Sequence, residues 1–158
     1  MWNFEGNWSK NIVMENKLEL RNNQIIKVTC AIIERNGRVL ATQRSEAMSM
    51  PMKWEFPGGK LEDGEDPAEC LVREIREELG VDVRILDSLS PVLHDYGDWT
   101  IELLPYICEI IRGDIVLHEH RAVTWKEPPE LPDLDWPDAD IPVILEYLDN
   151  HGRGGNRR

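Results

Sequence analysis

Residues 59–81 read GKLEDGEDPAECLVREIREELGV, and this stretch decides the fold. Asp66 is a suitable N-cap and Pro67 suits the first helical position, so a helix is expected to begin here. Gly80 is expected to end it. Three apolar residues recur at helical spacing and predict one face turned toward a core. They are Leu71, Ile75 and Leu79.

Glu74, Glu77 and Glu78 lie on a different face of this expected helix. Like charges three or four residues apart on a helix cost about 0.2–0.5 kcal/mol per pair unless something neutralises them. Carboxylates gathered on a rigid helix suit a hard divalent cation, and Mg²⁺ usually binds one or two protein carboxylates together with substrate phosphates. The helix alone leaves a second interpretation open, in which Glu69, Arg73 and Glu77 form exposed ion pairs on a solvated face.

The residues just before the helix favour a site over a plain acidic face. Residues 54–60 read WEFPGGK, a short apolar element broken by Pro57, Gly58 and Gly59. Adjacent glycines allow the backbone to approach a metal ion or a phosphate closely. Two glycines alone would fit an ordinary connection equally well. The glycines together with the acidic helix therefore indicate a metal or phosphate site.

The spacing of these residues resembles the complete signature of the Nudix hydrolases, with no position departing. It runs from Gly59 through Glu65 and the segment REIREELGV, residues 73–81. The resemblance implies an α/β (α+β) fold, a Nudix α/β/α sandwich with a curved mixed β-sheet and a loop-helix-loop. It also implies hydrolysis of a nucleoside diphosphate linked to another moiety, with Mg²⁺ (or Mn²⁺) as cofactor.

The same resemblance assigns roles by position in the signature. Arg73 would orient the glutamates, and Glu65 would be a structural partner and not a ligand. Glu119 lies in the segment HEHR, residues 118–121, shortly before Trp125. Its position resembles that of an additional metal-binding or catalytic glutamate, and the alternative is a surface carboxylate. The expected metal ligands are the Gly59 carbonyl and the carboxylates of Glu74, Glu77, Glu78 and Glu119. Catalysis is expected from Glu74, Glu77, Glu78, Arg73 and Glu119.

The sequence does not decide which glutamate is the general base. Either Glu78 or Glu119 could be the general base that removes a proton from water. The neighbouring His118 and His120 are expected to be exposed loop histidines and not ligands.

Three further segments resemble the MutT-type branch of the family. They read VTCAIIERNGRVLATQR (28–44), KWEFPGGK (53–60) and LDWPDADIPVI (134–144). This branch cleaves nucleoside triphosphates and includes enzymes that sanitise oxidised dGTP and relatives that act on pyrimidine nucleotides. The resemblance therefore implies that an NTP or dNTP, oxidised or modified, such as 8-oxo-dGTP or a cytidine nucleotide, is hydrolysed to a monophosphate and pyrophosphate in nucleotide-pool sanitation.

The branch also suggests which residues hold the substrate. Arg44 matches an arginine that contacts the nucleotide, and Glu55 and Phe56 lie where the branch lines its nucleotide pocket. Trp99 could stack on a base. For Arg44 the alternative is a surface position at a strand end, for Phe56 a core position, and for Trp99 an ordinary strand position.

Asp140 departs from the best-studied oxidised-guanine enzymes of the branch, which carry an asparagine at this point. An ionised carboxylate only accepts hydrogen bonds, so it would favour donor-rich base edges such as the exocyclic amine of cytosine. Asp140 is thus expected to bind the base, unless it simply caps the last helix.

Two other functions stay open at this point. One is Nudix hydrolysis of another nucleoside diphosphate derivative, such as ADP-ribose or a dinucleoside polyphosphate. The other is a non-catalytic nucleotide-sensing module, although a binder has no need of the glutamate cluster.

Composition fits a small enzyme with a small-molecule substrate. The net charge of −12 argues against binding polymeric nucleic acid. Cys30, Cys70 and Cys108 are an odd number without metal-site spacing, so buried free thiols are expected. No export signal or membrane span is evident, and a cytoplasmic location with a monomer or homodimer is expected.

The chain of 158 residues is expected to form one domain. Residues 1–24 are interpreted as an N-terminal appendage that is flexible, packs on the domain or contributes to a dimer. Residues 25–150 are interpreted as the Nudix domain, and residues 151–158 as a loose tail. Asn36 and Gly37 predict a hairpin. The expected strands cover residues 25–33, 38–43, 83–89, 99–112 and 122–126, and a final helix covers residues 141–150.

Overall fold

The computed structural model describes residues 25–151. The predicted N-terminal appendage, residues 1–24, and the tail after residue 151 lie outside the described residues, so both interpretations stay predictions. The elements, in chain order, are β1 (Ile25–Arg35), β2 (Arg38–Gln43), β3 (Trp54–Glu55), β4 (Gly58–Lys60), α2 (Pro67–Leu79), β5 (Asp82–Ser88), β6 (Val92–Asp95), β7 (Thr100–Arg112), β8 (Ala122–Lys126), the 3₁₀ helix η1 (Pro128–Asp133) and α3 (Asp140–Asn150).

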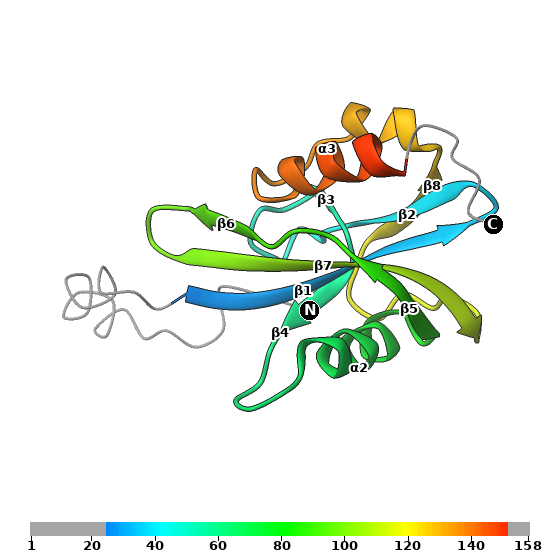
Figure 1. Ribbon diagram of the computed structural model, residues 1–158, viewed down its shortest axis with the longest axis horizontal. Helices are drawn as coiled ribbons and strands as arrows, with labels where there is room; N and C mark the ends of the chain where they lie inside the picture. Colours follow the sequence, from blue (N-terminus) through cyan, green and yellow to red (C-terminus); the bar gives the residue numbers. More distant parts are fainter. Residues whose placement is uncertain (1–24, 152–158) are drawn as a thin grey trace.

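The strands form one mixed sheet between two helical layers (Figure 1). Its main order is β3-β2-β1-β7-β5, with β4 paired to β1, β6 to β7 and β8 to β2. Strands β1 and β7 run parallel, and the other pairs are antiparallel. Helix α2 covers one face, while α3 and η1 cover the other (Figure 1). The three-layer mixed α/β fold is therefore confirmed.

Strand β1 explains why the sheet needs a helix on each face. Its side chains alternate between faces, and both sets are buried. Val28 and Ile32 belong to the core beneath α3, whereas Ala31 and Ile33 belong to the core beneath α2. The apolar stripe of α2, Leu71, Ile75 and Leu79, is fully buried in that second core.

The local predictions around the hairpin and α2 are confirmed. Asn36 and Gly37 adopt φ angles of 52° and 75°, as a two-residue hairpin between β1 and β2 requires. The Asp66 carboxylate accepts hydrogen bonds from the backbone N–H groups of Ala68 and Glu69 at 3.0 and 3.2 Å. Gly80 ends the helix in the left-handed conformation, with φ 68° and ψ 20°.

Four elements were not anticipated: β3, β4, β6 and η1. Each has six residues or fewer. Strand β4 exists because it pairs with β1, and β6 because it pairs with β7. Strands this short show too few residues for a periodic pattern to be recognised in the sequence. No helix within residues 25–151 has the length and apolar character needed to span a membrane.

Replacement of Asp66 by alanine should remove the cap of α2. We expect the Asp66→Ala variant to lose about 0.5–2 kcal/mol of unfolding free energy in urea denaturation, because two helical N–H groups lose their acceptor. Asp63→Ala, an exposed aspartate in the preceding loop, is the matched control and should change it by less than about 0.5 kcal/mol. Equal effects of the two substitutions would contradict the capping role.

Candidate active site

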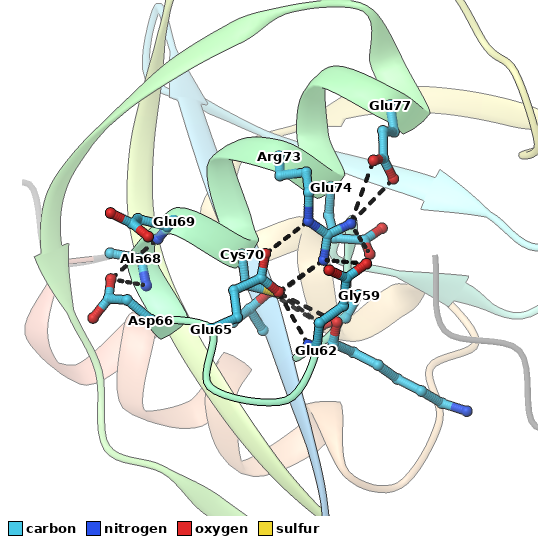
Figure 2. Close-up of polar contacts among 12 residues, drawn as sticks. Gly59, Glu62, Glu65, Asp66, Ala68, Glu69, Cys70, Arg73, Glu74 and Glu77 are labelled. Carbon is cyan, nitrogen blue, oxygen red and sulfur yellow. Dashed lines mark hydrogen bonds and ion pairs between the residues drawn. The ribbon is translucent and has the colours of Figure 1, made fainter.

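Arg73 organises the acidic face of α2 (Figure 2). Its Nε and Nη2 donate to the two carboxylate oxygens of Glu65, each at 2.8 Å. Its Nη1 donates to Glu74 Oε1 at 3.0 Å and to Glu77 Oε2 at 3.2 Å. The hydrogen bonds from Arg73 lower the pKa of Glu65 to about 2, and in return Glu65 raises the pKa of Arg73. Arg73 thus lies against three carboxylates that would otherwise repel one another.

The two adjacent glycines allow α2 to approach the sheet. A Cβ at Gly59 would overlap the carboxylate of Glu74, and a Cβ at Gly58 would overlap the backbone carbonyl of Thr29. Neither position can carry a side chain without displacing a neighbour. Because these two residues have no Cβ, the Glu74 carboxylate can lie directly against strand β4.

Glu78 lies deepest among the glutamates of this face. It is 1 % exposed, and its Oε2 accepts a hydrogen bond from the Gly58 N–H at 3.3 Å. Burial raises its pKa well above the ordinary value, and the neighbouring carboxylates of Glu55 and Glu74 raise it further. A bound cation would favour the ionised form of this buried carboxylate.

The donor set fits a hard divalent cation, because it consists of carboxylate and carbonyl oxygens on rigid elements. Within residues 25–151 no three acidic, histidine or cysteine side chains converge on one point in this arrangement. Arg73 Nη1 lies between Glu74 and Glu77, which accounts for part of that separation. Convergence on a cation would require Glu77, whose side chain is 58 % exposed, to turn from Arg73.

The register of β4 distinguishes the two glycine carbonyls. Ala31 N donates to Pro57 O, and Leu61 N donates to Lys27 O. Every second residue pair of an antiparallel ladder is hydrogen-bonded, so the pair between these two, Thr29–Gly59, also directs its N–H and C=O groups toward the partner strand. The Gly59 carbonyl also accepts from Thr29 Oγ1 at 3.2 Å. Gly58 directs its N–H toward Glu78, and in an antiparallel strand its carbonyl points to the same side.

A second polar cluster lies at the end of β2. Arg44 is fully buried, and its Nη1 donates to Glu55 Oε2 at 2.8 Å while its Nε donates to the Ser49 carbonyl at 2.6 Å. His120 Nε2 lies 2.8 Å from the other Glu55 oxygen. The expectation that His120 is exposed is wrong, because its ring is enclosed beside Glu55. His118 is exposed as expected.

Asp140 belongs to the same cluster and does not act as the cap of α3. It is the first residue of that helix and is 3 % exposed, and the N-cap, Ala139, makes no side-chain capping bond. Burial and the nearby Glu55 raise its pKa, while the Phe56 N–H and Arg44 oppose that shift. The charge of Glu55 raises the pKa of both Asp140 and Glu78, so the two clusters lie close enough to interact electrostatically.

The other predicted residues occupy different surroundings. Phe56 is buried and packs on Trp136 at 4.7 Å between ring centroids, as its core alternative requires. Trp99 is half-buried near Tyr96, whose hydroxyl accepts the Ala139 N–H at 3.0 Å. Glu119 is exposed in the segment between β7 and β8. Roles in binding or catalysis remain predictions for these residues.

The sequence did not single out Tyr96 or Ser49, and it assigned His120 to the surface. Tyr96 and Ser49 lie in loops without a motif. Tyr96 meets the site through a hydrogen bond from the distant Ala139 N–H, and Ser49 through a hydrogen bond from Arg44. For His120 one signal was present, since it lies beside Glu119 in the segment HEHR. That segment gives no indication of which of its two histidines turns inward.

Comparisons with known proteins agree with this geometry. A family model described as the NUDIX domain matches residues 24–146. The chain is 34% identical over 125 residues to the CTP pyrophosphohydrolase of Escherichia coli K12, covering 79% of this chain and 93% of that protein. It is 32% identical over 111 residues to the 8-oxo-dGTP diphosphatase of the same strain, covering 70% and 86%. The solution structure of the E. coli ORF135 protein matches with a TM-score of 0.73 and 31% identity, covering 86% and 98%.

The two glycines should respond differently to alanine. Gly58→Ala should lower the unfolding free energy by about 1–3 kcal/mol, because its Cβ meets rigid backbone of β1. Gly59→Ala should cost less than Gly58→Ala, because its Cβ meets the movable end of the Glu74 side chain. Urea denaturation of both variants checks the order. A Gly59→Ala variant less stable than Gly58→Ala would contradict these contacts.

Proposed function

Since this chain belongs to the Nudix hydrolase family, we propose that it converts a nucleoside triphosphate and water to a nucleoside monophosphate and pyrophosphate. The observation that carries the proposal is the acidic face of α2, held by Arg73 directly above the Gly58–Gly59 backbone. A binding module would not need to bury Glu74 and Glu78 at 6 and 1 % exposure against this backbone. Nudix hydrolases generally use divalent metal ions, and Mg²⁺ or Mn²⁺ suits these oxygen ligands.

The glutamates of α2 would hold the metal together with one glycine carbonyl. The register of β4 supports the carbonyl of Gly58 in that role, in place of the Gly59 carbonyl that the sequence motif suggested. Glu119 is the further candidate ligand. When bound, a divalent cation polarises phosphate oxygens and lowers the pKa of water.

The chain itself must accept a proton from the attacking water. A general base works best with a pKa near the operating pH, and burial raises the pKa of Glu78 in that direction. Glu119 remains the alternative base, since it is exposed near the end of α2. Arg73 acts on this chemistry by holding the buried Glu74 carboxylate in place, while the exposed Glu77 would turn from Arg73 to reach the cation.

The base would be recognised at the cluster around Glu55. Both Glu55 oxygens are engaged, one by Arg44 and the other by His120, so Asp140 is the acid that we assign to the base edge. The enclosure of Arg44 supports an indirect role for it, through Glu55 and Ser49. Two relatives are named for a cytidine nucleotide and for an oxidised guanine nucleotide, which makes these the first substrates to test.

A substrate panel tests the proposal. The purified protein with Mg²⁺ is incubated with common NTPs and dNTPs, 8-oxo-dGTP, 5-methyl-dCTP, ADP-ribose and a dinucleoside polyphosphate, and pyrophosphate is distinguished from orthophosphate. We expect pyrophosphate and a monophosphate from a subset of the triphosphates. Cleavage of ADP-ribose or the dinucleoside polyphosphate alone would replace the proposal by the other Nudix chemistry. No turnover of any compound would favour a sensing module.

The Glu77→Gln variant links that activity to the acidic face. We expect turnover to fall by about a hundredfold or more, since losses of outer contacts alone cost metal sites 10–100-fold. The fold should survive because Glu77 is exposed. Glu69→Gln, an exposed glutamate on the same helix, is the matched control and should turn over like the unmodified protein. Full activity of Glu77→Gln would remove this glutamate from the metal site.

The Asp140→Asn variant tests base recognition separately. Asparagine always presents an amide donor, whereas the Asp140 carboxyl donates only when it is protonated, so the ranking of bases by kcat/KM should change by about tenfold. The unfolding temperature should not fall, because burial already opposes the charge of Asp140. An unchanged ranking across the panel would remove Asp140 from the base pocket.

A further inference from the structure

The segment between β7 and β8 crosses from the end of α2 to the end of β2. Val116 N donates to the Leu79 carbonyl at 2.9 Å, and His118 N donates to the Glu78 carbonyl at 3.2 Å. At the other end, Arg121 N donates to the Gln43 carbonyl at 2.9 Å. These backbone contacts place residue 119 beside the helical turn that carries the last glutamates of the signature.

Ile115 and Leu117 of this segment pack on the core beneath α2, and one polar side chain, that of His120, also points inward. The His120 side chain is 0 % exposed, and its Nε2 lies 2.8 Å from Glu55 Oε1. Its neighbour Glu119 and the preceding His118 are exposed. His120 thus links the segment to β3, only three residues before Gly58 in the chain.

The surroundings of His120 also favour one position for the proton of its neutral ring. Its Nδ1 is buried and has no hydrogen-bond partner within the part of the chain that the structure describes. A proton on Nδ1 would therefore lack an acceptor, whereas a proton on Nε2 has the Glu55 carboxylate. The favoured arrangement is donation from Nε2–H to Glu55 Oε1.

We propose that His120 is a positioning residue, which by donating Nε2–H to Glu55 fixes the adjacent Glu119 beside the acidic face of α2. The inference rests on the proposed function in so far as Glu119 takes part in the metal site. Without this bond the segment keeps its backbone contacts at 116, 118 and 121 and the packing of Ile115 and Leu117, but the stretch next to Glu119 loses the inward anchor that His120 provides. Residue 119 then samples more positions, and a metal site depends on ligands held in place.

The test compares two substitutions at one position. His120→Leu removes the donor, while His120→Gln retains an amide N–H that can reach a similar point. His118→Leu, two residues earlier and exposed, is the matched control. Mn²⁺ affinity of the metal-free protein, measured by electron paramagnetic resonance, is followed together with kcat, KM and the unfolding temperature.

We expect His120→Leu to weaken Mn²⁺ binding and lower kcat by about 10-fold or more, in the range seen for lost outer contacts of metal ligands. His120→Gln should stay within about threefold of the unmodified protein, and His118→Leu should match it. The proposal would be overturned if a folded His120→Leu variant kept the Mn²⁺ affinity and the kcat of the unmodified protein. Equal losses in His120→Leu and His120→Gln would also overturn it.

A measurement on the unmodified protein stands even if His120→Leu does not fold. Long-range ¹H–¹⁵N spectra of the imidazole rings should show His120 protonated at Nε2, and a proton on Nδ1 alone would overturn the proposal. If the substrate panel shows no turnover, the proposed function fails. The Mn²⁺ affinities and the imidazole spectra would still decide the role of His120.

Discussion

The site depends on one constraint: the Gly58–Gly59 backbone lies close to β1 on one side and to α2 on the other. Side chains at these two positions would meet the Thr29 carbonyl and the Glu74 carboxylate. Three fully buried apolar residues of α2 hold the helix against the sheet, each contributing about 1.5–3 kcal/mol by removal from water. That packing offsets the cost of burying the carboxylates of Glu74 and Glu78 on the adjacent face.

The buried ionisable groups of the site are predominantly acidic. The buried acids are Glu55, Glu74, Glu78 and Asp140, and Arg44 is the buried arginine among the described residues. Burial raises the pKa of Glu78 and Asp140, while Glu55 is held by Arg44 and His120. Such clustering of costly acids is characteristic of functional sites and not of a stable core. Positive charge nearby, from Arg73 or from a bound cation, would stabilise the ionised form of these acids.

Local signals predicted much of the fold. The Asn36–Gly37 turn, the cap at Asp66 and the stop at Gly80 depend on neighbouring residues, so each could be found by inspection of a few positions. The short strands β4 and β6 could not, because their three and four residues carry no recognisable periodicity and they exist only through pairing with β1 and β7. The buried thiols of the three cysteines followed from composition and are confirmed.

The sequence by itself determined the acidic helix, its caps and the glycines before it, because spacing along one helix fixes which residues share a face. It also indicated Arg44, Glu55 and Asp140 as a group through resemblance. Only the tertiary structure decided that Arg44 is enclosed, that His120 turns inward onto Glu55, and that Gly58 directs its backbone toward Glu78. The physical reason is that these contacts join residues 11–65 positions apart, which no local pattern of the chain encodes.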